Sequence, residues 1–260
     1  MIKIAIKSFL LLLLFHSSVM CQNSESAKIR YSFGYGVGLN QSKDENLIPK
    51  VHRGVAHFFD FRIEKKTDLF SSFQLQLGYG KLKTAIENEA VSFNAQVSLS
   101  YCHDFKMIEN KRYGYYLGPG ASLTSSLSEY ENWDEAHAYW GNFLSLGSSQ
   151  ILFMTLDKNK SWITELEISL LGCYTRPDER RRYANEYWTV SNILKIMNSH
   201  YHFGLWNRAF QVKLATEYRT PLFADHLLAL SFSIYYSRLK AEDGNPLKEI
   251  IHRLGVGLWL

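Results

Sequence analysis

The sequence predicts an all-β protein, a single antiparallel up-and-down barrel that crosses a membrane. Two observations lead to this prediction. Apolar and polar residues alternate with a period of two from Ile29 to the last residue, Leu260, which is the pattern of strands with two different faces. The segments between the alternating stretches are of two kinds, short polar turns and mostly longer connections, and the two kinds succeed one another along the chain.

The first alternating stretch, residues 29–40, shows what each face requires. Large apolar side chains occupy one face, and glycine, serine, asparagine or arginine occupies the other. A lipid-facing surface needs the first kind of residue, and a narrow lumen accommodates the second. Glycine is normally unfavourable inside a strand. In a tight barrel we expect it to make room for long side chains from the opposite wall.

Similar stretches follow along the chain, and together they predict about ten strands (roughly 8–12), each near the length that a tilted membrane-spanning strand needs. The stretch at 137–155 is the least regular of them. The alternating cores lie at 29–40, 58–64, 73–80, 93–101, 113–123, 137–155, 162–170, 210–219, 228–236 and 253–260.

The connections predict which end of the barrel faces which compartment. Outer-membrane barrels have short periplasmic turns and long outer loops, and an even number of strands brings both chain ends to the periplasmic side. The compact turns are at 65–68, 108–111, 157–160 and 220–225. The other connections are at 41–53, 83–89, 127–136, 175–207 and 239–248.

The N-terminal residues have the layout of a secretory signal. Lys3 and Lys7 precede an unbroken apolar run at 9–15, and small residues follow at 17–19, as in a cleaved signal peptide. The apolar run is too short to remain as a spanning helix. We therefore expect a signal peptide at 1–21 and a mature barrel domain at 22–260. In a rival interpretation, Cys21 is the lipidated first residue of a lipoprotein.

Composition excludes several classes of protein. The formal net charge of +4 is small and dispersed, so we expect no nucleic-acid partner. Mean hydropathy is slightly negative, which excludes a bundle of transmembrane helices, and the aromatic content of 15% suits the interfacial girdles of a membrane barrel. Cys102 and Cys173 fall near opposite ends of their strands, too far apart for a disulfide.

With these features the sequence resembles small bacterial outer-membrane β-barrel proteins of the OmpA-like or porin-like type. The resemblance rests on the signal, the alternation, the loop asymmetry and the amphipathic last strand, and it covers nearly all of the mature chain. It implies a Gram-negative outer membrane, with membrane lipids, lipopolysaccharide and the barrel-assembly machinery as partners. Such proteins usually end in an aromatic residue, whereas here Leu260 is last and Trp259 precedes it. The resemblance is to an architecture, which does not determine function.

The predicted lumen face carries charges of both signs. Long side chains of opposite charge can fill a narrow barrel with ion pairs, and pairing is what makes their burial tolerable. The alternative is a polar path for a small solute, although about ten strands leave only a slim interior. The residues predicted for this network are Arg30, Asp60, Arg62, Glu64, Glu165, Glu167, Lys213, Glu217, Arg219 and Arg253.

The predicted outer loop at 175–207 is too long for a simple connection, and such loops are often functional. Arg180, Arg181 and Arg182 suit contact with lipopolysaccharide phosphates or with a protein partner. Apolar residues at spacings of three and four predict a short helix that caps the barrel or dips into the lumen; they are Tyr187, Val190, Leu194, Met197 and Tyr201.

An enzymatic function is the main alternative. Carboxylates and histidines in the outer loops could activate water, as at the rim of barrel proteases of the omptin type, and a lipid hydrolase could use Ser199 with His200. The sequence contains no omptin motif and no hydrolase signature. The rim residues concerned are Asp134, Glu135, His137, Asp178, His200 and His202.

We therefore expect a non-catalytic outer-membrane protein with a structural, adhesive or narrow-pore role. His200 and His202 have no third ligand at a diagnostic spacing, so we expect no metal, and we expect no other cofactor. A second alternative is a soluble periplasmic barrel that binds a ligand in an apolar interior. In that barrel the two faces of each strand would be reversed.

Overall fold

The structure is a computed structural model that describes residues 29–44, 51–67, 69–84, 89–105, 112–130, 137–157, 160–176, 201–223, 226–240 and 246–260. This part of the chain contains no helix long and apolar enough to cross a membrane. Its strands are β1 (Ile29–Asp44), β2 (His52–Lys66), β3 (Leu69–Lys83), β4 (Glu89–Asp104), β5 (Tyr113–Tyr130), β6 (His137–Asp157), β7 (Lys160–Thr175), β8 (His202–Leu205), β9 (Ala209–Phe223), β10 (His226–Leu239) and β11 (Leu247–Trp259).

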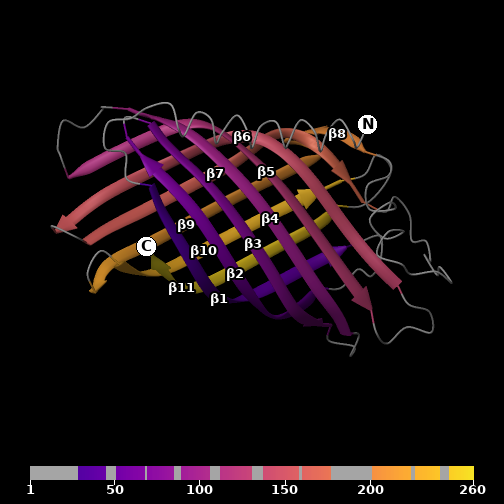
Figure 1. Ribbon diagram of the computed structural model, residues 1–260. Helices are drawn as coiled ribbons and strands as arrows, with labels where there is room; N and C mark the ends of the chain where they lie inside the picture. Colours follow the sequence, from indigo (N-terminus) through magenta and orange to yellow (C-terminus); the bar gives the residue numbers. More distant parts are fainter. Residues whose placement is uncertain are drawn as a thin grey trace.

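The strands close into a barrel. Each strand pairs antiparallel with the next in the chain, except that β9 pairs with β7 and not with β8, and β11 pairs with β1 (Figure 1). Strands β8 and β9 pair with successive parts of β7, at 171–174 and 161–168, so the two share one place in the wall. The eleven strands therefore fill ten places. The predicted fold, an all-β antiparallel barrel of about ten strands, is confirmed.

The two ends of the barrel differ in their connections. The start of β1 and the end of β11 lie together at one end, where Leu260 and Tyr31 exchange backbone hydrogen bonds of 2.8 and 3.3 Å. We call this the terminal end; β2–β3, β4–β5, β6–β7 and β9–β10 are joined there by short segments. The opposite end, the loop end, carries the remaining connections, the longest of which joins β7 to β8.

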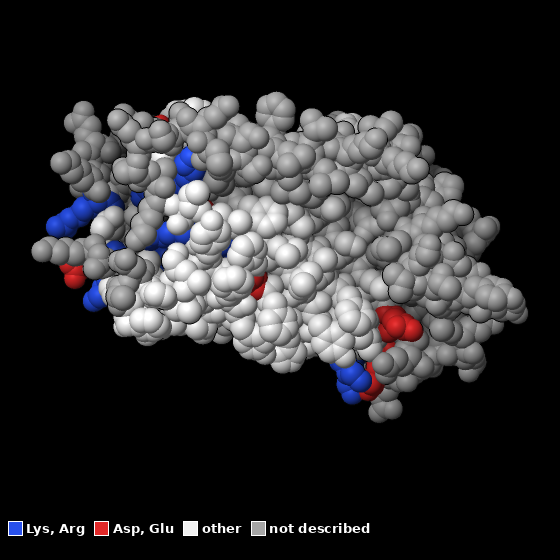
Figure 2. Space-filling view, in the orientation of Figure 1, with Lys and Arg blue, Asp and Glu red and all other residues white. Residues whose placement is uncertain are grey.

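The outward face of the barrel is apolar and the inward face is polar. In β1 the outward residues Phe33 and Leu39 are each 56% exposed, whereas the inward Asn40 is fully buried. Figure 2 shows a broad, almost wholly uncharged area between charged residues near the two ends. A water-soluble barrel buries its apolar face instead. The soluble ligand-binding alternative therefore does not fit this arrangement, and a lipid-facing surface does.

Apolar clusters line the lumen on either side of its charged middle. The cluster toward the terminal end consists of Phe70, Cys102, Tyr116, Ile151 and Ile163. Two clusters lie in the half of the barrel toward the loop end: one of Ala56, Phe58, Tyr235 and Ile251, the other of Phe143, Tyr174, Ala209 and Leu239.

Glycines on the lumen face make room for a neighbouring strand. A Cβ atom added to Gly78 would lie 2.7 Å from Cε1 of Phe58, and one added to Gly38 would lie 3.0 Å from its Cε2. The expectation that these glycines accommodate side chains of the opposite wall was wrong here. The register places Gly36 and Gly78 directly beside Phe58, one on each flanking strand, so its ring lies across the two neighbouring strands.

Strand boundaries differ from the prediction mainly at the loop end. Strand β8 begins at His202, inside the segment predicted as loop, because residues 202–205 continue the pairing along β7. Strand β11 begins at Leu247, earlier than its alternating core. Cys102 and Cys173 are both free, as predicted. The predicted signal at 1–21, the helical stripe at 187–197 and Arg180, Arg181 and Arg182 lie outside the described residues.

Replacing Gly78 by alanine should destabilise the barrel by about 1–3 kcal/mol, because the new methyl group would press into the Phe58 ring. The matched control is Gly257→Ala, whose methyl group would meet no atom closer than 3.5 Å. The stability of both variants is measured through a urea series. At each urea concentration, an unheated gel gives the fraction of protein that keeps the fast-migrating folded form. Equal midpoints for the two variants would show that Phe58 moves aside at no cost.

Candidate functional site

The charged residues predicted for the lumen lie on the inward faces of five strands. Strand β2 contributes Asp60, Arg62 and Glu64 at every second position, and Arg30 of β1 stands beside Glu64 in the register. The others extend from β7, β9 and β11; they are Glu165, Glu167, Lys213, Glu217, Arg219 and Arg253. The strand period of two is what brings these side chains to one face.

One ion pair spans the full width of the lumen. Strands β2 and β7 are five places apart in either direction around the ten-place ring, so they lie opposite each other. Arg62 of β2 nevertheless reaches Glu165 of β7, with Nη2 3.1 Å from Oε2. The Nε atom of Arg62 is also 2.8 Å from Oε1 of Glu64. The guanidinium of Arg62 therefore bridges opposite walls of the barrel.

A second bridge joins another pair of opposite strands. Lys213 of β9 donates a 2.8 Å hydrogen bond to Oε1 of Gln74 on β3, and these strands are also five places apart. The same ammonium is 2.9 Å from Oε1 of Glu167. The two bridges cross the lumen along different diameters, so side chains obstruct it from more than one direction.

Arg219 contacts two carboxylates and an aromatic ring. Its two terminal nitrogens donate to the two carboxylate oxygens of Glu64, both at 2.8 Å, and its Nε contacts Glu217. The guanidinium carbon lies 3.8 Å from the centre of the Trp259 ring, and Trp259 Nε1 donates to Glu217 at 3.0 Å. Forked and cation–π contacts of this kind favour arginine. They link β9 to β2 and to the last strand, β11.

Asp60 accepts hydrogen bonds from side chains of two further strands. Arg253 of β11 donates to its Oδ1 at 2.9 Å, and Gln76 of β3 donates to the same atom at 2.9 Å.

The ten predicted residues comprise five cations and five carboxylates, so their formal charges cancel. Buried charges are tolerable when they are paired, and the described ion pairs include every one of these residues except Arg30, which stands beside Glu64 in the register.

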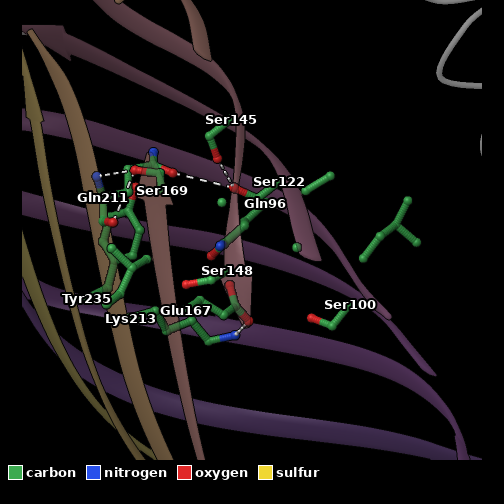
Figure 3. Close-up of a pocket in the computed structure, with 15 residues that line it drawn as sticks. Gln96, Ser100, Ser122, Ser145, Ser148, Glu167, Ser169, Gln211, Lys213 and Tyr235 are labelled. Atoms are coloured by element: carbon green, nitrogen blue, oxygen red, sulfur yellow. Dashed lines mark hydrogen bonds and ion pairs between the residues drawn. The ribbon is translucent and has the colours of Figure 1, made fainter. Parts of the chain in front are cut away.

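Smaller polar side chains also occupy the lumen beside the charged groups (Figure 3). The hydroxyl oxygens of Ser122 and Ser145 are 2.8 Å apart, and Ser122 donates to Gln211 at 3.4 Å. The cavity next to them has a volume of about 30 Å³. A second cavity, between Asp60 and Lys213, has about 50 Å³. Cavities of this size have room for a few water molecules.

The residues of the enzymatic alternative are not brought together in the described structure. Asp134, Glu135, Asp178, Ser199 and His200 lie outside the described residues. His137 opens β6, and the structure does not describe its side chain. His202 opens β8 with its ring 5.6 Å from that of Tyr174. In the described part of the chain no three His, Cys, Asp or Glu residues are grouped so that they could hold a metal ion.

Two lumen contacts were missed from the sequence. Glu249 is buried and accepts a 3.2 Å hydrogen bond from Asn40; extending the alternation of β11 back beyond Arg253 would have found it. Trp259 falls on the expected lumen face. Its contact with Arg219, however, depends on the barrel's closure, which no local sequence pattern encodes.

Comparisons with known proteins bear on the fold. No protein-family model and no curated protein matches the sequence. The outer-membrane protease OmpT from Escherichia coli is similar in structure, with a TM-score of 0.55 and 8% identity over 91% of this chain and 98% of that chain. This chain has the fold of an outer-membrane β-barrel protein. At 8% identity the likeness leaves the activity open.

Two other matches are more distant. The translocator domain of the autotransporter NalP from Neisseria meningitidis has a TM-score of 0.42 and 12% identity, over 98% of this chain and 96% of that chain. The attachment invasion locus protein Ail of Yersinia pestis has a TM-score of 0.37 and 12% identity, over 89% and 98%.

Replacing Arg62 by methionine should destabilise the barrel by about 3–5 kcal/mol, because Glu165 would be left buried without its cation. The double variant Arg62→Met with Glu165→Met should recover most of that loss. The exposed pair of Lys83 and Glu89 is the control, and Lys83→Gln should cost less than about 1 kcal/mol. Urea midpoints measure all three. A loss for Arg62→Met no greater than for Lys83→Gln would contradict a stabilising bridge.

Proposed function

We propose that this protein is a non-catalytic resident of the bacterial outer membrane whose lumen is closed to solutes, and that it acts as a structural or adhesive barrel. The apolar outward face and the fold support the membrane location. The lumen supports the closed state. A barrel of this kind acts through its wall and its loops, because no solute passes through its interior.

The two bridges between opposite walls carry this proposal. An open pore needs a continuous water-filled path, yet Arg62 contacts Glu165 and Lys213 contacts Gln74 across the whole lumen. Apolar clusters stand on both sides of these bridges. Separating the buried partners would leave charges uncompensated, so we expect the closed state to persist.

The same pairing disfavours the lumen as a catalytic centre. Glu64 contacts both Arg62 and Arg219, and Asp60 accepts from Arg253 and Gln76. General acid–base catalysis needs a group that is available to the substrate's proton, and these carboxylates are engaged by side chains of the barrel itself. The hydrolase alternative therefore rests on the outer loops alone.

Conductance of the refolded chain in planar bilayers tests the closed lumen. The natural protein should show no stable open level, and Arg62→Ser combined with Lys213→Ser should produce one, because both bridges lose their cation. The opened pore should prefer cations, since Asp60, Glu64, Glu165 and Glu167 would remain. Lys160→Ser, at the exposed start of β7, is the control and should behave like the natural protein. A stable open level in the natural protein would sink the proposal.

A further inference from the structure

An amide side chain lies on the outward face of the barrel, where the other strands present apolar residues to lipid. Gln150 of β6 is partly exposed, whereas Ser149 and Ile151 on either side of it are fully buried. The alternation of the strand therefore points Gln150 outward. Its Oε1 accepts a 3.1 Å hydrogen bond from the hydroxyl of Tyr115 on the adjacent strand β5. On β1, by contrast, the outward residues between 29 and 39 are all aliphatic or aromatic.

The depth of Gln150 can be read from the register. Trp162 of β7 and Tyr218 of β9 are paired on the outward face near the terminal end, and such aromatic residues mark a membrane interface. Trp162 also pairs with Met154 of β6, and Gln150 is four residues further toward the loop end. At about 3.3 Å per residue and a tilt of about 40°, this is about 10 Å from the interface. The apolar belt of such barrels is about 25 Å tall, so Gln150 lies near its middle.

The hydrogen-bonding capacity of this amide is only partly used. A glutamine side chain offers two acceptor positions on its oxygen and two donors on its nitrogen. The Tyr115 hydroxyl occupies one acceptor position, and among the described residues no side chain accepts from Nε2 of Gln150. Lipid provides no partner for the remaining positions, and an unpaired polar group in the apolar belt is costly. The arrangement is favourable where another polar group meets it at the same depth.

The surface around Gln150 allows a close approach. Pro119 and Ala121 are outward residues of β5 on its loop-end side, and both are small. Small residues let two membrane-embedded elements come near each other. On its terminal-end side, Thr164 of β7 and Thr216 of β9 are paired on the outward face and add two hydroxyl groups. This face is therefore flatter and more polar than the outward face of β1.

A second copy of the chain supplies the matching group by symmetry. Two copies in one membrane share the same orientation, so a twofold axis between them runs along the membrane normal. Such an axis brings identical residues together at identical depth. A glutamine amide is complementary to itself in this arrangement, because Nε2 of each copy can donate to the free acceptor position of the other. A different membrane protein would need a polar side chain at this depth, whereas a second copy has one.

We propose that this protein forms a twofold dimer in the membrane through the outward faces of β5, β6 and β7, with the two Gln150 amides paired at its centre. The inference rests on the proposed membrane location and adds a partner, a second copy of the chain. The lumen of each copy takes no part in the contact and stays closed.

Sedimentation equilibrium of the full chain in density-matched phosphocholine micelles measures the dimer. The dissociation constant should rise at least about tenfold in Gln150→Leu, which loses the paired amides. Gln150→Asn keeps an amide and should retain part of the association. The matched control is His57→Leu on β2, since His57 is also outward and its Nδ1 lies 2.6 Å from the hydroxyl of Tyr35. This control should associate like the natural protein.

Cross-linking in phosphocholine vesicles identifies the face that forms the contact. Both chains used for it carry Cys173→Ser, which removes the partly exposed native thiol. Leu152→Cys, beside Gln150, should give covalent dimers with a short bifunctional thiol reagent. Val37→Cys should give none, because β1 lies five places around the ring from β6. The two positions are matched in exposure, at 42% for Leu152 and 40% for Val37.

Three results would overturn the inference. These are a natural chain that stays monomeric at every ratio of protein to micelle, equal association of Gln150→Leu, and cross-links at Val37→Cys in preference to Leu152→Cys. The gel shift on boiling, measured for every variant, separates this failure from failure of the membrane proposal. A natural chain that does not fold in phosphocholine contradicts the membrane location, whereas folded chains that do not associate through Gln150 contradict the dimer alone.

Discussion

The narrowness of the ten-place ring is the constraint on which the rest of the structure depends. Side chains from opposite walls can meet across a ring of this size, and Arg62 meets Glu165 in this way. Every inward residue must therefore be chosen with its distant partners, not only with its neighbours on the adjacent strands. This explains why charged groups of opposite sign, such as Arg62 and Glu165, stand on opposite walls of the lumen.

The architecture was largely predictable from the sequence because each strand has its own alternation of apolar and polar residues. Alternation shows in stretches such as residues 29–40, and both faces of β1 came out as the pattern indicated. The strand ends were less predictable, because pairing can continue where alternation has faded. Strand β8 exists because residues 202–205 meet the end of β7, and the local sequence contains no sign of this.

For the lumen, the sequence indicated which residues point inward but not which of them meet. The ten charged residues predicted for the lumen, from Arg30 to Arg253, follow from the strand period of two. The partnerships follow from how the strands are staggered around the closed ring, which places Arg62 opposite Glu165 and Arg219 against Trp259. Stagger is a property of the whole sheet. A contact between Gln74 and Lys213, 139 residues apart, therefore could not be inferred from either strand.

The contacts that cross the lumen also bear on the order of events as the chain assembles. Arg219 and Glu64 are separated by 155 residues, and contacts so distant in the chain form late because the intervening chain must first be organised. Without the pairing of β11 with β1, the sheet is an open ribbon in which charges that meet across the lumen lack their partners. Such a ribbon is poorly suited to lipid, since unpaired charges are costly there. Closure of the ring and burial of the charges therefore coincide.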